Sequence, residues 1–209
     1  MKRSIFALTL CTAFSVQTFA AQTVTVAFDK SRSNPLLSDP AFAVSAAEYV
    51  AQKIKPLKEG DLVRIKSFGS RTDGSNLYEQ EIPITRHMRA KNVADAVKNY
   101  ILGLPAQKDQ GQSSTNIVAF LEFDRHFGCD DQGTVIVLTD ALEASDYVDS
   151  NTLKSGKAHL PEPRNSLAGC TVIFYGLGAG LSGPEAEIIH DEWARFITSA
   201  GGQFIAEIK

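Results

Sequence analysis

Two short runs of the sequence are almost wholly apolar: Thr134-Val-Ile-Val-Leu138 and Thr171-Val-Ile-Phe-Tyr175. A strand with one solvated face alternates apolar and polar residues, whereas a parallel strand covered by helices on both faces is a continuous apolar run. The two runs therefore predict central strands of a parallel sheet. This restricts the chain to an α/β architecture, because both faces of such a sheet must be covered.

The remaining segments alternate between strand and helix patterns. Strands are predicted at 23–28, 62–68, 77–84 and 203–208, and helices at 38–54, 88–104, 113–128 and from about 184 onward. This alternation predicts a doubly wound, mostly parallel α/β sheet with helices on both faces. Glu79, Glu81 and Pro83 indicate that the strand at 77–84 lies at an edge of the sheet.

The first 20 residues have the composition of a signal peptide. Lys2 and Arg3 precede a largely apolar stretch at 5–16, and Thr18-Phe-Ala20 forms a small-x-small cleavage signal. We therefore expect an exported protein, periplasmic or secreted, with a single domain at 21–209. Removal of the leader from the 209-residue chain leaves 189 residues, which suits one α/β domain.

The charge distribution argues against two classes of partner. Loss of the two basic leader residues changes the formal charge from −3 to −5, and the remaining basic residues are scattered. We therefore expect neither a nucleic-acid partner nor an anionic membrane surface. No later segment approaches the roughly 18 consecutive apolar residues of a membrane span.

Two cysteines remain after Cys11 leaves with the leader: Cys129 and Cys170. In an oxidising compartment the expected state is a single disulfide between them. The alternative is two buried free thiols that lie far apart. The cysteines and histidines show no metal-site spacing such as Cys-x-x-Cys or His-x-x-x-His.

Oxygen-bearing side chains gather at three places that the predicted fold brings together. Asp29-x-Ser31-x-Ser33 follows the first strand, Asp140 follows a central strand, and Thr115 lies at a predicted helix start. In an open α/β sheet, ligands bind outside the carboxyl ends of the strands. Crowded hard oxygen atoms suggest a divalent cation, and Asp29, Thr115 and Asp140 can all converge on one crevice at that edge.

These three pieces resemble the metal-ion-dependent adhesion site of von Willebrand factor A (VWA) domains. The resemblance covers essentially all of 21–209 and implies a six-stranded sheet whose third strand is an antiparallel edge. It implies that the five residues bind Mg²⁺, with Mn²⁺ or Ca²⁺ as alternatives. The bound ion would capture an Asp or Glu carboxylate of a partner protein, in an envelope assembly, secretion or adhesion system.

The resemblance also has local consequences. The strand order of VWA domains implies that Cys129 and Cys170 lie at the end of the sheet opposite the metal. A disulfide there would stabilise the fold without touching the metal site. Arg32 and Asn34 stand where many relatives have small residues, and Ala141 stands where glycine is frequent. These departures bear on the identity of the partner, because the surrounding loops control access to the metal.

An enzyme is the main alternative class. A metal-dependent phosphatase or nuclease would need three or four clustered acids, but position 31 is serine. Glu143 and Asp146 could supply further carboxylates, although we expect them to be solvated loop or helix-start acids. G-x-S-x-G and Walker A patterns are absent from the sequence. We therefore predict a binding module rather than an enzyme; a VWA fold with a vestigial metal site is the other alternative.

Three alternating glycines, Gly176, Gly178 and Gly180, are a weak phosphate-loop signal. In a dinucleotide-binding fingerprint the third glycine follows the second by three positions, whereas here it follows by two. The acidic residue that would bind the ribose is also missing at the expected distance. We therefore expect a tight turn after a late strand, because glycine readily adopts the required backbone conformations.

Overall fold

The computed structural model describes residues 21–71, 74–77, 79–123, 127, 129 and 133–207. The predicted leader at 1–20 lies outside these residues. So do the expected helix end at Gly128 and the expected last strand residue, Ile208.

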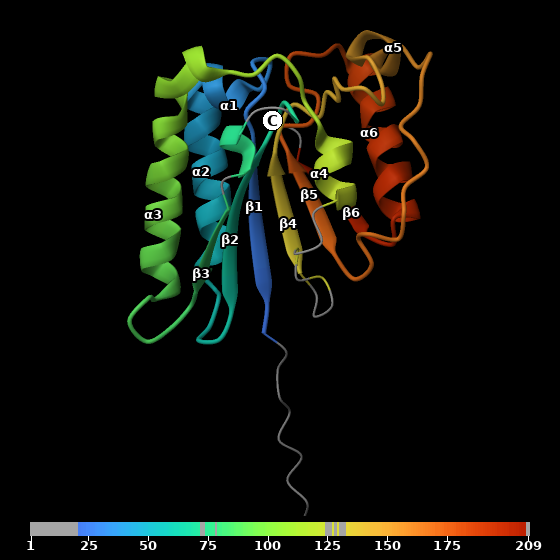
Figure 1. The fold of residues 1–209 in the computed structure, drawn as a ribbon. Coiled ribbons are helices and arrows are strands. Elements are labelled where there is room, and N and C mark those ends of the chain that lie inside the picture. Colours follow the sequence, from blue (N-terminus) through green and yellow to red (C-terminus); the bar gives the residue numbers. More distant parts are fainter. Residues whose placement is uncertain are drawn as a thin grey trace, which may run out of the picture.

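Among the described residues, six strands form one sheet in the order β3-β2-β1-β4-β5-β6 (Figure 1). β3 pairs antiparallel with β2, and every other neighbouring pair is parallel. The strands are β1 (Thr23–Asp29), β2 (Leu62–Phe68), β3 (Glu79–Pro83), β4 (Thr134–Leu138), β5 (Thr171–Tyr175) and β6 (Gln203–Glu207). The predicted α/β class, the mostly parallel sheet and its antiparallel edge strand are therefore confirmed.

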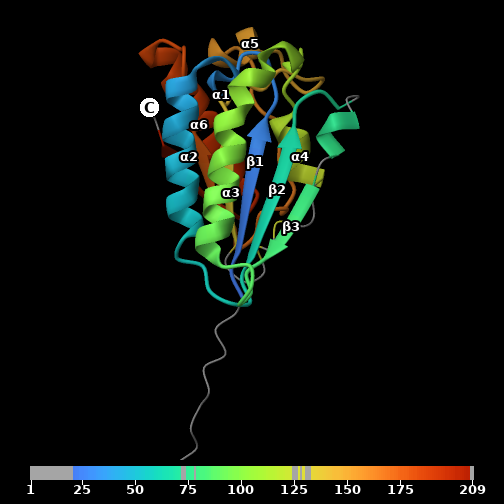
Figure 2. The same cartoon turned by 90° about the vertical axis from the view of Figure 1, so that its left-hand side faces the viewer.

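Helices cover both faces of this sheet. The α-helices are α1 (Pro35–Ser38), α2 (Pro40–Ile54), α3 (Ala90–Gly103), α4 (Ile117–Phe123), α5 (Ser150–Lys154) and α6 (Gly183–Ser199), and the 3₁₀ segments are η1 (Gly74–Leu77) and η2 (Leu104–Gln110). α2 and α3 lie side by side on one face, and α4 and α6 lie on the other (Figures 1 and 2). Among the described helices, none is long and apolar enough to cross a membrane.

Each face has its own hydrophobic core. On the side of α2 and α3, Val26 and Phe28 of β1 belong to the same buried cluster as Val50 and Val97. Ala27, between them in β1, belongs to the second cluster, with α4 and α6. Successive side chains of a strand point to opposite faces, so a strand buried on both faces must be apolar at every position.

Local signals account for the start of α2. The Asp39 carboxylate accepts hydrogen bonds from the amides of Ala41 and Phe42, at 2.8 and 3.2 Å, and Pro40 is the first helical residue. An aspartate at the N-cap satisfies amides that have no partner within the helix, and proline is favoured directly after it. The predicted helix at 38–54 is therefore confirmed, with its first residue at Pro40.

Two predicted boundaries are wrong. The helix expected from Ser113 begins at Ile117, because Thr115 instead exchanges two backbone hydrogen bonds with Ala144, each 3.0 Å long. The strand expected at 77–84 is shorter, since Leu77 ends the 3₁₀ segment η1 and pairing with β2 starts at Glu79. In both cases, long-range pairing overrides the local pattern.

The structure also contains elements that the sequence pattern did not indicate. α1 is one turn long, and α5 is capped by Asp149, whose carboxylate accepts from the amides of Asn151 and Thr152 at 3.0 and 3.1 Å. Residues 155–170 then reach β5 without a helix or strand. The side chains of Leu160 and Leu167 are buried in the second core, and this packing holds segment 155–170 against the domain.

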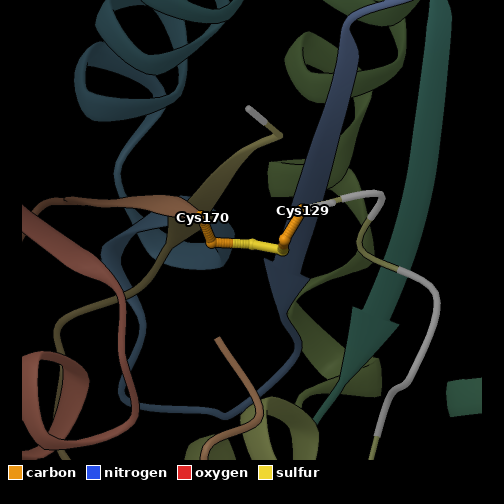
Figure 3. Close-up of a disulfide and its surroundings, with 2 residues drawn as sticks. All are labelled: Cys129 and Cys170. Carbon is orange, nitrogen blue, oxygen red and sulfur yellow. A yellow bond between two sulfur atoms is a disulfide. The ribbon is translucent and has the colours of Figure 1, made fainter. Parts of the chain in front are cut away.

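Cys129 and Cys170 form a disulfide (Figure 3). Cys170 directly precedes β5 and therefore lies at the amino ends of the parallel strands, whereas Asp29 is the last residue of β1. The predicted disulfide and its position at the far end of the sheet from Asp29 are confirmed, and the alternative of two free thiols is wrong.

Removal of this disulfide should weaken the fold without involving Asp29. The bond joins residues 41 positions apart, and closing a loop of that length contributes about 4 kcal/mol in the chain-entropy model. We expect the Cys129→Ala/Cys170→Ala double variant to lose about 2–4 kcal/mol of unfolding free energy, measured by urea denaturation. Native protein in reductant serves as the control and should approach the variant; equal midpoints for oxidised native protein and variant would contradict the prediction.

Candidate metal centre

The five predicted ligand residues lie at the carboxyl edge of the sheet. β1 and β4 are parallel neighbours, with Phe28 opposite Leu138 (carboxyl ends at the top of Figure 1). Asp29 is the last residue of β1, and Asp140 follows the end of β4, so the two lie at adjacent strand ends. Thr115 lies beside the segment after Asp140 because it pairs with Ala144. Three segments that are distant in sequence therefore meet at one edge.

Hydrogen bonds within the Asp-x-Ser-x-Ser loop define its shape. The Asp29 Oδ1 atom accepts from the Ser31 amide at 2.7 Å, and the Ser31 and Ser33 hydroxyl oxygens lie 3.3 Å apart. Asp29 and Ser31 are buried, while Ser33 is exposed. The loop thus presents one carboxylate and two hydroxyl groups from the buried strand end toward the surface.

Gln112 connects this loop to the segment that carries Thr115. Its amide donates to the Lys30 carbonyl at 2.9 Å, and its carbonyl accepts from the Arg32 amide at 2.8 Å. The Gln112 side chain accepts from the Ser70 amide at 2.5 Å. One residue therefore links three loops at the carboxyl edge of the sheet.

Asn34 is a second residue that organises the candidate site. Its Nδ2 atom donates to the carbonyls of Asp29 and Leu138, at 2.7 and 2.9 Å, and its Oδ1 atom accepts from the Leu36 amide at 3.1 Å. The side chain is fully buried. Asn34 thus joins the ends of β1 and β4 and caps α1; an asparagine before proline was the available N-cap signal.

Replacement of Asn34 by alanine should destabilise the domain. The change leaves two buried carbonyls and one helix-start amide without their partner, and we expect a loss of about 2–4 kcal/mol of unfolding free energy in urea denaturation. The matched control is Asn151→Ala, at an exposed position of α5, which should stay within about 0.5 kcal/mol of the native protein. Similar losses for both variants would exclude a special role for Asn34.

Thr139 supports the Asp29 carboxylate from the neighbouring strand end. Its hydroxyl donates to Asp29 Oδ2 at 2.6 Å and accepts from the Ala141 amide at 3.0 Å. Asp29 therefore has one oxygen bonded to Ser31 and the other to Thr139. Thr139 is adjacent in sequence to Asp140, but only the pairing of β1 with β4 brings it to Asp29.

Asp29 and Asp140 are both buried, and no cationic side chain contributes to the pKa shift of either one. Burial, and after it the negative charge of Asp140, raise the pKa of Asp29 to about 7, although hydrogen bonds from Thr139 and Ser31 lower it. Burial also raises the pKa of Asp140, opposed by hydrogen bonds from the Leu142 amide and the Ser33 hydroxyl. A divalent cation is the type of ligand that would balance two such carboxylates.

The backbone after Asp140 adopts an unusual conformation. Ala141 has a φ of 66°, in the left-handed region that favours glycine. Its carbonyl accepts from the Trp193 indole at 2.8 Å, and the Asp140 carbonyl accepts from the Gly178 amide at 3.2 Å. Contacts with α6 and with the turn after β5 therefore hold the segment that carries Asp140.

The three glycines after β5 form a turn in which each has a positive φ, at 101, 79 and 80°. A side chain at Gly176 would also collide with the Phe42 ring, 2.5 Å from the position that a Cβ would take. The expected turn is therefore present, with backbone conformation and close packing as the reasons for glycine.

The sequence predicts that Glu143 is a solvated loop or helix-start acid, and the structure shows that it is not solvated. Its side chain is fully buried, and Oε2 accepts from the Ile117 and Val118 amides at 2.7 and 3.0 Å. It therefore caps α4 from a distant segment. Burial raises its pKa to about 7, and Oε1 has no hydrogen-bond partner. Asp146, in contrast, is exposed as expected.

Glu143 should make stability depend on pH. Its pKa is higher in the folded protein, about 7, than the ordinary value of 4.5, so the folded state binds the proton more tightly. The contribution of Glu143 to stability is therefore greatest below about pH 4.5 and falls as the pH rises to about 7. Relative to the native protein, Glu143→Gln should gain unfolding free energy between about pH 5 and about pH 7.5.

This prediction is checked by urea denaturation in EDTA at several pH values. Asp146→Asn, at an exposed position of the same segment, is the control and should run parallel to the native protein. Because Asp29 and Asp140 are common to all three proteins, their effects cancel in the differences. A constant difference between Glu143→Gln and the native protein would contradict the raised pKa.

The donor set fits a hard divalent cation. Two carboxylates and three hydroxyl groups come from three converging segments, and such oxygen ligands suit Mg²⁺, Mn²⁺ or Ca²⁺. In the described part of the chain, no three His, Cys, Asp or Glu side chains form a metal-binding group, so the hydroxyl groups are essential to this candidate site. No protein-family model matches the sequence, and the search of curated proteins found no matching relative.

Proposed function

We propose that this chain is an exported VWA-type binding module that holds Mg²⁺ through Asp29, Ser31, Ser33, Thr115 and Asp140. The observation that carries the proposal is the convergence of these residues at one edge of a sheet with strand order β3-β2-β1-β4-β5-β6. Mn²⁺ and Ca²⁺ are alternative ions. When bound, the cation supplies an open coordination position for an Asp or Glu carboxylate of a partner protein.

The roles of the chain's own side chains follow from their charges and contacts. Asp29 and Asp140 supply two negative charges, which offset the charge of a divalent cation. Ser31, Ser33 and Thr115 add neutral oxygen atoms, so the site does not acquire excess negative charge that would repel an acidic partner. Thr139 and the Ser31 amide orient the Asp29 carboxylate through hydrogen bonds of 2.6 and 2.7 Å.

The contacts of Glu143 favour binding over hydrolysis. A metal-dependent hydrolase on this sheet would need a further carboxylate beside the metal. Glu143 is the nearest acid after Asp140 in sequence, but its Oε2 atom is committed to the α4 amides. The proposal therefore assigns Glu143 to the support of the loop that bears Thr115, and it assigns no catalytic residue.

The setting proposed for this module is the periplasm or the extracellular space. The leader-like segment at 1–20 and the Cys129–Cys170 disulfide both support an oxidising compartment. Capture of an acidic partner there suits an envelope assembly, secretion or adhesion system.

The decisive test replaces one charge in the candidate site. Asp140→Asn should weaken Mg²⁺ binding at least tenfold in isothermal titration calorimetry, because one of two anionic ligands is lost. Asp146→Asn removes an exposed acid from the same segment and should retain native affinity. Circular dichroism verifies that both variants fold.

Partner capture provides the second measurement. Envelope extract passed over the immobilised native protein should yield a partner in Mg²⁺ that is released by EDTA and is not captured by Asp140→Asn. Undiminished Mg²⁺ affinity in folded Asp140→Asn would refute the site. Normal capture in EDTA would instead favour a vestigial metal site, and turnover of a phosphate ester that Asp140→Asn abolishes would favour a hydrolase.

A further inference from the structure

A pocket of about 570 Å³ lies next to the candidate metal site. Ser33, one of the proposed ligands, forms part of its wall, so the pocket opens directly beside the position where a partner carboxylate would bind. Other lining residues come from the start of α2 and from the turn after β5. Its volume is within the range of about 300–1,000 Å³ typical of ligand pockets.

Part of the pocket lining is apolar, and packing holds its largest side chain, Phe42, in place. Phe42 is buried, with its ring against the backbone of Gly176 and 5.6 Å from the Tyr175 ring, between centroids. The Ser45 hydroxyl is bonded to the Tyr175 hydroxyl at 2.5 Å. Pro35, Ala41 and Ala179 add to the apolar lining.

Asp39 gives the pocket its charge. Of the described residues that line the pocket, Asp39 alone carries a charge, and its side chain is exposed. The Arg32 guanidinium, which does not line the pocket, donates to the Gly111 carbonyl at 3.3 Å, directly after η2. The pocket therefore combines apolar lining residues with one negatively charged side chain.

We propose that this pocket receives a Lys or Arg side chain of the same partner segment whose carboxylate binds at the metal. The aliphatic stem of a basic side chain packs on Phe42, Ala41 and Ala179, and its charged group pairs with Asp39. The ligand class is therefore a peptide segment with an acidic residue and a basic residue close together. This inference rests on the proposed function.

The test is selection from a phage-displayed library of short peptides with one fixed Glu and random flanking positions. Peptides bind to the immobilised full chain in Mg²⁺ and are eluted with EDTA, so that only metal-dependent binders are sequenced. We expect Lys and Arg to be enriched at one preferred position about three- to fivefold over an unselected library, as for one exposed ion pair.

Two matched variants identify the source of this preference. Asp39→Asn and Asp149→Asn each neutralise an exposed aspartate that caps a helix, and asparagine caps helices equally well. Asp149 does not line the pocket. Selection with Asp39→Asn should lose the basic enrichment and keep the EDTA elution, whereas selection with Asp149→Asn should keep both.

The outcomes separate the two proposals. The pocket inference would be overturned if EDTA elutes Glu-containing peptides that show no enrichment of Lys or Arg. It would also be overturned if that enrichment persists with Asp39→Asn. In both cases the proposed function would still stand. An absence of any Glu-dependent, EDTA-eluted peptide would overturn the proposed function and the inference with it.

Discussion

The parallel pairing of β1 with β4 is the constraint on which the rest of the structure depends. It brings together Asp29 and Asp140, and it brings the Thr139 hydroxyl to the Asp29 carboxylate at 2.6 Å. Asn34 then bonds to the carbonyls at both strand ends. A shift of this register by one residue would send the alternating side chains to the wrong core and would separate the two carboxylates.

The carboxyl edge of the sheet combines several features that oppose stability. Two buried aspartates have raised pKa values, Ala141 adopts a left-handed backbone conformation, and Glu143 has a buried oxygen without a hydrogen-bond partner. Such features cluster at functional sites, where the surrounding fold compensates for them. Here the two hydrophobic cores and the disulfide at the far end of the sheet provide that compensation.

Several parts of the fold were predictable because their signals are local. The apolar runs that became β4 and β5, and the capping aspartate before Pro40, depend on neighbours within a few residues. The start of α4 was not predictable in this way, because the pairing of Thr115 with Ala144 competes with helix formation. The same applies to Glu143, whose loop-like sequence context conceals a buried cap for α4.

The sequence by itself determined the kinds of atom available: an Asp-x-Ser-x-Ser loop, a threonine, a second aspartate, and strands whose apolar pattern requires cover on both faces. Only the tertiary structure decided that β1 lies between β2 and β4, and that Asn34, Gln112 and Thr139 organise the candidate site. The physical reason is range. Helix caps and strand patterns depend on residues near in sequence, whereas these contacts join segments up to 110 positions apart and form only when the sheet assembles.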